Sequence, residues 1–267
     1  MTKDQFDLSN INGLGGATKK KLEDIGINNV MDLLVRSPQE IKDLAGMKIE
    51  TVNKYTELAR QYLQENEIIS KDFITGEQVL KQRQSLDKIS TGTKCMDQLF
   101  DGGIEARALT EVYGEFGSGK TQFCHTLCVM VQKPKEEGGL NGGVLYIDTE
   151  GTFRPERIVS IAQKRGLDPI QANKNITVVR AHNSSHQLLI MQEAGKLIKE
   201  NNIKLIIVDS LTGLYRSEYL GRGTLSERQQ KLNTFIHLLI RTAETYNVIA
   251  VCTNQVLASP EIGRAHV

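Results

Sequence analysis

Hydrophobic periodicity divides the chain into two regions of different character. Up to about residue 63, apolar residues recur at helical spacing and predict helices over 17–25, 30–37, 38–44 and 49–63. Glycine-containing turns at 26–28 and 45–47 separate these helices. We therefore expect residues 1–63 to form a small all-α domain. The polar stretch that follows predicts a linker over 64–85, with a short helix running through Arg83 and Gln84.

From residue 86 the pattern alternates between strand and helix. The predicted strands cover 109–113, 144–148, 176–180, 204–208 and 248–253. The predicted helices cover 122–131, 155–165, 185–200 and 226–246, and Pro155 suits the first turn of its helix. This alternation is typical of an α/β domain with a mainly parallel sheet, which we expect over 86–260.

Composition adds little beyond the class of protein. The chain has 267 residues, of which 39% are apolar and 24% charged, as in ordinary globular proteins. It has no run of eighteen apolar residues and no signal peptide, so we expect a cytoplasmic protein with no membrane partner. Its net charge of +1 gives no indication of nucleic-acid binding, which would have to come from local geometry.

The four cysteines lack the spacing of a zinc site. Cys124 and Cys128 share a helix face near His125, whereas Cys95 and Cys252 are distant in sequence. Buried, reduced thiols are the preferred interpretation over a metal site.

The most specific motif follows the first strand of the α/β region and has the form G-x-x-x-x-G-K-[ST]. Its residues are Gly114, Glu115, Phe116, Gly117, Ser118, Gly119, Lys120 and Thr121. Glycines let backbone N–H groups close around phosphate oxygens, Lys120 would reach the β- and γ-phosphates, and Thr121 would hold Mg²⁺. A plain glycine turn is the alternative, but the flanking strand and helix favour a site for ATP and Mg²⁺.

Polar residues end several other predicted strands, where ligands bind in open α/β sheets. Asp209 follows a buried strand and is the expected Mg²⁺ partner. We expect Glu150 to orient or deprotonate the attacking water, with Asp148 as a rival and a helix-capping role as the alternative. Gln255 is a candidate γ-phosphate sensor, although a plain polar strand end fits it better from the residues alone. With Lys120, Glu150 and Gln255 form the expected catalytic set.

Several stretches make the chain resemble a known family. They are the phosphate loop, 146–157, 207–212, 221–223, 227–232 and 253–256. They closely resemble the archaeal RadA recombinases of the RecA-like ATPases, over about residues 8–257, and 146–157 is very specific. Members form filaments on single-stranded DNA, pair it with homologous double-stranded DNA and exchange strands. The resemblance implies a DNA-dependent ATPase of DNA repair and recombination, with a RecA-like P-loop ATPase core preceded by a helix-hairpin-helix domain.

The resemblance also implies roles for single residues. It makes Glu150 the water-activating residue and Asp209 the Walker-B carboxylate, places Arg157 against the adenine, and lets Gln255 couple the ATP state to DNA. Residues 215–223 resemble the first DNA-binding loop. The expected DNA contacts in and after it are Arg216, Tyr219, Arg222 and Arg228. Read alone, the acidic Glu218 and Glu227 would favour a solvated surface loop.

The N-terminal region fits the same interpretation. Residues 12–18, followed by a lysine-bearing helix, look like a helix-hairpin-helix element whose Gly13 and Gly15 offer N–H groups to a DNA phosphate. The alternative is an interaction module without DNA contact. In the linker, Phe73 corresponds to the family's polymerisation anchor, and Gly76 stands where the family usually has alanine. An intramolecular anchor is the alternative for Phe73.

The end of the chain departs from the family. The family continues beyond 256 through a second DNA-binding loop and further strands, so we expect the core over 86–260 to be truncated at its C-terminus. Residues 261–267 match the translation of a common sequencing adapter and are expected to be a foreign tail. The alternative function is a recombinase paralogue that mediates assembly without strand exchange. A RecA-like helicase or circadian-type ATPase would not predict the helix-hairpin-helix element or 221–223.

Overall fold

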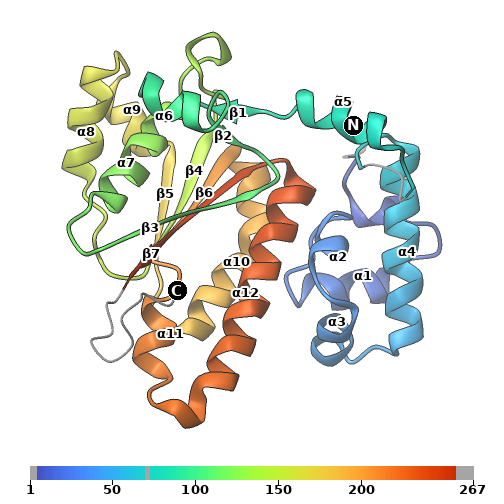
Figure 1. Cartoon of the computed structure of the whole chain (residues 1–267). Coiled ribbons are helices and arrows are strands. Elements are labelled where there is room, and N and C mark those ends of the chain that lie inside the picture. Colours follow the sequence, from blue (N-terminus) through green and yellow to red (C-terminus); the bar gives the residue numbers. More distant parts are fainter. Residues whose placement is uncertain (1–4, 70–72, 257–267) are drawn as a thin grey trace. The chain divides into compact units, whose positions relative to one another are not determined.

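A computed structural model describes residues 5–69 and 73–256 (Figure 1). The chain forms two compact units, with the main division between Leu86 and Asp87, and each unit is described by itself. The predicted tail over 261–267, and the end of the core over 257–260, lie outside the described residues.

The regular elements of the first unit, within its described residues, are all helices. Its elements are η1 (Leu8–Asn10), α1 (Gly16–Glu23), α2 (Asp32–Val35), α3 (Pro38–Ala45), α4 (Ile49–Glu65) and α5 (Gly76–Gln84). Apolar side chains from several of these elements form its core, and Leu8, Leu22, Ile41 and Leu63 are almost completely buried.

The helix predicted over 30–37 is shorter than expected. Only Asp32–Val35 is helical, because Arg36 and Ser37 both adopt extended backbone conformations. Proline disfavours a helical conformation in the residue before it, and Ser37 instead caps α3 by accepting a hydrogen bond from the Glu40 N–H at 3.2 Å. Pro38 therefore separates two helices rather than extending one.

The second unit contains a five-stranded parallel sheet in the order β3-β7-β6-β4-β5. The strands are β3 (Leu109–Gly114), β4 (Gly143–Asp148), β5 (Ile176–Arg180), β6 (Ile203–Asp209) and β7 (Ile249–Gln255). The central strands β4, β6 and β7 are almost entirely buried, which explains their continuous apolar runs. The predicted α/β class with a mainly parallel sheet is confirmed.

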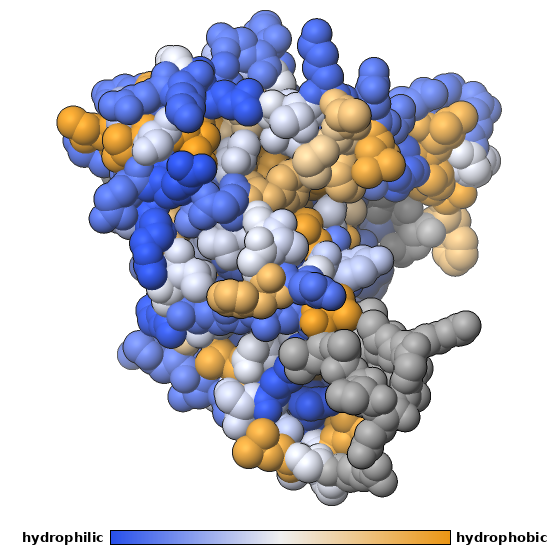
Figure 2. Space-filling model, turned by 60° about the vertical axis from the view of Figure 1, so that its left-hand side comes forward, coloured by the Kyte–Doolittle hydropathy of each residue, from blue (hydrophilic) through white to orange (hydrophobic). Residues whose placement is uncertain are grey.

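Helices cover both faces of this sheet. On one side lie α7 (Lys120–Met130), α8 (Pro155–Lys164) and α9 (Pro169–Lys174), and on the other α10 (Ser184–Glu200) and α12 (Leu225–Tyr246) (Figure 1). Seen from the side shown in Figure 2, hydrophobic residues lie in separate patches among hydrophilic ones. Within the described part of the chain, each helix is too short or too polar to span a bilayer.

Several short elements were not predicted from hydrophobic periodicity. The structure adds the antiparallel pair β1 (Lys88–Ile89) and β2 (Ile104–Glu105). It also adds α6 (Lys94–Leu99), η2 (Lys135–Glu137), α9, α11 (Gly213–Glu218) and η3 (Arg222–Thr224). Six residues complete fewer than two helical turns, which is too short for a helical period to show. Strand β7 also runs two residues past its predicted end, because Asn254 and Gln255 still pair with β3.

Candidate functional site

The register of the sheet gathers the polar strand ends along one edge. Gly114 pairs with Gln255, and Asp148 lies between Asp209 and Arg180. A cleft of about 300 Å³ opens at this edge beside the start of α7. Its lining residues are Phe116, Gly117, Gly119, Lys120, Thr121, Gln122, Glu150, Thr152, Asp209, Ser210, Thr253 and Gln255.

The predicted phosphate loop forms an open turn leading into α7. Gly117 and Gly119 have φ of +79° and +92°, which favour glycine, and a Cβ at either position would meet no atom within 4 Å. Among the residues that the structure describes, no side chain caps the N-terminus of α7, so its first N–H groups are available to an anion. Lys120 Nζ donates to the Gly114 and Glu115 carbonyl oxygens at 2.9 and 2.8 Å. These features fit a phosphate group.

The Asp209 carboxylate is buried and accepts hydrogen bonds from three hydroxyl groups, of which that of Thr152 is the longest at 3.5 Å. Tyr146 donates to Oδ2 at 2.7 Å, and Thr253 donates to Oδ1. Burial, and then the charge of Asp209, raises the pKa of Tyr146 well above its ordinary value, so the phenol stays protonated as a donor. Thr121 lines the same cleft, so the two residues offer oxygen ligands of the kind that Mg²⁺ prefers.

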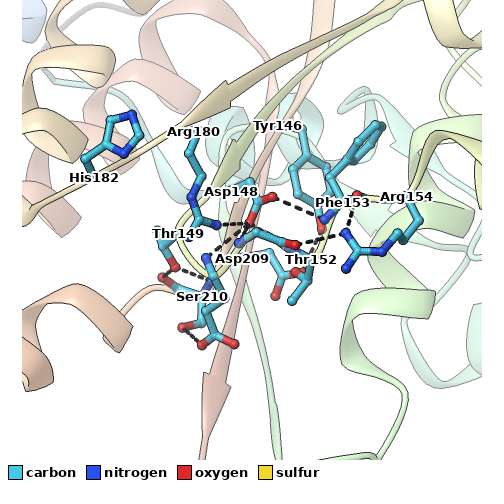
Figure 3. Close-up of polar contacts among 12 residues, drawn as sticks. Tyr146, Asp148, Thr149, Thr152, Phe153, Arg154, Arg180, His182, Asp209 and Ser210 are labelled. Carbon is cyan, nitrogen blue, oxygen red and sulfur yellow. Dashed lines mark hydrogen bonds and ion pairs between the residues drawn. The ribbon is translucent and has the colours of Figure 1, made fainter.

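The Asp148 carboxylate lies at the centre of a polar cluster (Figure 3). It accepts hydrogen bonds from four successive backbone N–H groups, those of Glu150, Gly151, Thr152 and Phe153. Arg180 adds an ion pair at 3.1 Å. Gly151 has a φ of +73°, and a Cβ there would lie 2.9 Å from the Arg180 guanidinium. Asp148 therefore shapes the turn that carries Glu150 and has little capacity left for substrate.

Glu150 is exposed and lines the cleft. Ser210 Oγ donates to its Oε1 at 2.7 Å, and Gln255 Nε2 lies 3.5 Å from each carboxylate oxygen. Glu150 does not cap α8, whose N-cap residue is Arg154 and which has no side-chain cap. Of the two rival carboxylates, the geometry leaves Glu150 accessible and Asp148 engaged.

Arg157 projects from α8 beside the start of α7. Its Nε donates to Gln122 Oε1 at 2.6 Å, and Gln122 is one of the residues that line the cleft. The structure thus places Arg157 next to the cleft through an exposed side-chain pair.

The segment expected to be a DNA-binding loop is partly helical. Arg216 lies within α11 and donates to the Gln255 carbonyl oxygen at 2.9 Å, and Arg222 begins η3. Tyr219 accepts a hydrogen bond from Lys231, whose Nζ lies 4.8 Å from the ring centroid. Arg216 and Arg228 both line a groove of about 750 Å³ against α12. Burial, and then the charge of Arg228, lowers the pKa of Arg216.

Both acidic neighbours of this segment are engaged within the chain. Glu218 accepts hydrogen bonds from the backbone N–H of Ser184, at 2.7 Å, and from its hydroxyl. Glu227 forms an ion pair with Lys231 at 3.0 Å. Glu218 and Glu227 therefore both have partners within the chain, whereas the sequence alone favoured a solvated surface loop for them.

The N-terminal glycine turn leaves backbone groups accessible. Gly13 has a φ of +79°, and a Cβ at Gly13 or Gly15 would meet no atom within 4 Å. Helix α1 starts after Gly15 without a side-chain cap. Lys19 in α1 pairs with Asp7 at 2.9 Å. Hydrogen bonds from Ser9, and then from Lys19, lower the pKa of Asp7 well below its ordinary value.

Three cysteines are buried as expected, while Cys95 is exposed. Burial raises the pKa of Cys124 and Cys128 well above the ordinary thiol value, and that of Cys252 to about 12. Within the described residues, no group of three or more potential ligands could hold a metal ion. His125 is buried against the rings of Tyr146 and Phe153, at centroid distances of 5.8 and 5.3 Å, and these two rings also contact each other at 5.0 Å.

Several residues that support the site were not predicted from the sequence. Tyr146, Thr253 and Arg180 contact the two aspartates, and Asn254 contacts Arg216. One signal was available for Tyr146: it lies two residues before Asp148, and so faces the same side of its strand. The contacts of Asn254 depend on strand pairing and left no comparable signal.

Comparison with known proteins places the chain in a family. The sequence profile of the Rad51 family matches residues 82–267. Over 261 residues the chain is 59% identical to the DNA repair and recombination protein RadA of Cenarchaeum symbiosum (strain A), an alignment that covers 98% of this chain and 66% of the relative. The chain thus spans about two thirds of the length of that relative. Since the family profile matches more than half of the sequence, the chain belongs to the Rad51 family.

Proposed function

We propose that the chain is a DNA-dependent ATPase that binds single-stranded DNA as a filament and promotes pairing and strand exchange with homologous double-stranded DNA. The observation that carries the proposal is the cleft at the carboxyl edge of the sheet, where the phosphate loop, Asp209, Glu150 and Gln255 lie together. The similarity to a protein named for DNA repair and recombination supports its biological role.

The cleft suits ATP and Mg²⁺ in its chemistry. Lys120 and the first N–H groups of α7 would bind the phosphates, and Arg157 would lie against the base. Thr121 and Asp209 would hold Mg²⁺, which neutralises charge on the phosphate oxygens when bound. Glu150, oriented by Ser210, would position the attacking water and accept its proton.

The proposed DNA contacts lie in both units. In the second unit, Arg216, Arg222 and Arg228 would bind phosphates, and Tyr219 would stack on a base. In the first unit, the open turn at Gly13 and Gly15 supports the proposal of a helix-hairpin-helix domain over 1–63, because within the described residues the N–H groups of these two glycines have no backbone partner and could meet a phosphate.

Filament assembly is proposed to use the linker over 64–85. Phe73 is 96% exposed, and α5 buries none of its side chains. A large aromatic side chain with this exposure is a suitable anchor for a neighbouring subunit. Gly76 is the first residue of α5, whose N-terminus is capped by a capping box between Thr75 and Gln78. The capping box gives the start of α5 a defined conformation close to Phe73.

The test compares ATP hydrolysis with and without single-stranded DNA in the wild-type chain and in Glu150→Gln. We expect the variant to lose about 100-fold or more in DNA-stimulated rate while it still binds ATP, because the neutral amide cannot accept a proton. Glu156→Gln, an exposed acidic change in the first turn of α8, is the matched control and should keep the wild-type rate.

Full DNA-stimulated hydrolysis by Glu150→Gln would show that the catalytic assignment is wrong. Strand exchange is measured on the same preparations. ATP and DNA binding without strand exchange would favour the mediator alternative over a recombinase.

A further inference from the structure

Helix α11 contacts the nucleotide site through its first residue. A Cβ on Gly213 would lie 2.8 Å from Ser210 Oγ and 3.3 Å from Glu150 Oε1. The backbone at the start of α11 therefore packs against the proposed water-activating carboxylate and the hydroxyl that orients it. Because this packing is close, a movement of Glu150 or Ser210 on nucleotide binding would displace the start of α11.

One turn later, Arg216 holds the end of β7. Its two guanidinium nitrogens donate to the Gln255 carbonyl oxygen at 2.9 Å and to Asn254 Oδ1 at 3.4 Å. The side chain of Gln255 faces Glu150 at 3.5 Å. The proposed DNA-contacting arginine and the proposed γ-phosphate sensor are thus joined by a hydrogen bond.

Asn254 connects three elements from a buried position. Its Oδ1 accepts from the Thr212 hydroxyl at 2.7 Å and from Arg216, and its Nδ2 donates to Glu111 Oε1 on β3 at 3.0 Å. Thr212 occupies the N-cap position of α11, yet its hydroxyl donates to Asn254 instead of capping the helix. One amide therefore fixes both the start of α11 and the guanidinium of Arg216.

We infer that Asn254 is a positioning residue that couples the state of the nucleotide site to the orientation of Arg216 through α11. The inference rests on the proposed function. Asn254 and Gln255 are consecutive in one strand, so a shift of Gln255 toward or away from Glu150 moves both acceptors of Arg216 together. Glu111 keeps the amide in the orientation that accepts from Arg216, since only Nδ2 can donate to its carboxylate.

The experiment measures the affinity of the full chain for a fluorescent oligo-dT strand with and without a slowly hydrolysed ATP analogue and Mg²⁺. The ratio of the two dissociation constants is the coupling factor, and linkage requires the same factor in nucleotide affinity with and without DNA. We expect Asn254→Ala to lower this factor about five-fold or more, while nucleotide affinity without DNA changes less than about two-fold.

Asn233→Ala is the matched control, an exposed asparagine of α12 that lines the same groove, and it should keep the wild-type factor. A second pair covers the case in which Asn254→Ala fails to fold. Glu111→Gln retains an acceptor oxygen for Asn254 and should preserve coupling, whereas Glu111→Ala should lower it.

The outcomes separate the inference from the proposed function. A wild-type chain that binds neither nucleotide nor DNA would overturn the proposed function and the inference with it. A chain that binds both ligands with no coupling between them would overturn the inference alone. Folded Asn254→Ala and Glu111→Ala variants that keep the wild-type factor would do the same.

Discussion

The phosphate loop and the acidic edge of the same cleft are built in opposite ways. In the loop, Lys120 bonds to oxygens of its own turn, and Phe116 is 91% exposed. At the acidic edge, Asp148 and Asp209 are buried, and their partners come from strands 32 to 63 residues away as well as from the adjoining turn. The loop is locally determined, whereas the edge depends on the whole sheet.

Because of this difference, we expect substitutions in the loop to affect ligand binding and substitutions at the acidic edge to affect stability. Residues whose contacts are confined to the loop can be changed without loosening the fold, because few tertiary contacts depend on them. Residues at the acidic edge hold several strands and turns together, so their loss leaves buried donors without acceptors. Substitutions in the two regions should therefore produce different measurements.

The largest expected effect is on nucleotide binding by Lys120→Ala. We expect the dissociation constant for ATP to rise about 100-fold, because a charge-assisted contact to phosphate contributes about 1.5–3 kcal/mol. The free energy of unfolding without nucleotide should change by less than about 0.5 kcal/mol. Calorimetric titration and urea unfolding measure the two quantities. A large loss of stability in Lys120→Ala would contradict the claim that the loop can be changed without loosening the fold.

Asp148→Asn tests the stability of the acidic edge. The variant removes the charge paired with Arg180 and one of the oxygens that accept backbone N–H groups, so we expect a loss of about 2 kcal/mol in the free energy of unfolding. Urea unfolding without nucleotide measures it. Lys42→Ala, at a half-exposed helical position of the first unit, should stay near wild type. Unchanged stability in Asp148→Asn would mean that the edge is no more constrained than the loop.

The smallest expected effect is the dependence of the free energy of unfolding on pH that the buried His125 causes. Burial lowers the pKa of His125 from its ordinary 6.5, so below pH 6.5 the unfolded chain takes up a proton that the folded chain does not. Stability is retained above pH 6.5 and is lost as the pH falls toward the folded pKa, by at most about 1.4 kcal/mol per pH unit. Urea unfolding between pH 7.5 and about 5 measures the free energy of unfolding at each pH. Its slope against pH should be shallower for His125→Leu than for the wild-type chain. Equal slopes would exclude His125 as the cause.

Long, strongly patterned elements were predictable from sequence, and short ones were not. The five strands of the sheet and the long helices agree with prediction to within a few residues, because each is long enough for its apolar residues to show a strand or helix pattern. Helix α11 was predicted as a loop, since six residues with glycine at the start give no periodic signal. The fold class followed from the long elements, but the geometry around Arg216 did not.

The sequence by itself determined the phosphate loop and the residues at the strand ends, because both are properties of consecutive residues. Only the tertiary structure decided which of Asp148 and Glu150 remains accessible, since Arg180 and Ser210 reach them from other strands or strand ends. It also decided that Asn254 joins Glu111 to Arg216, contacts that span 143 and 38 residues of sequence. Such contacts arise from strand register, which is set by the packing of the whole sheet.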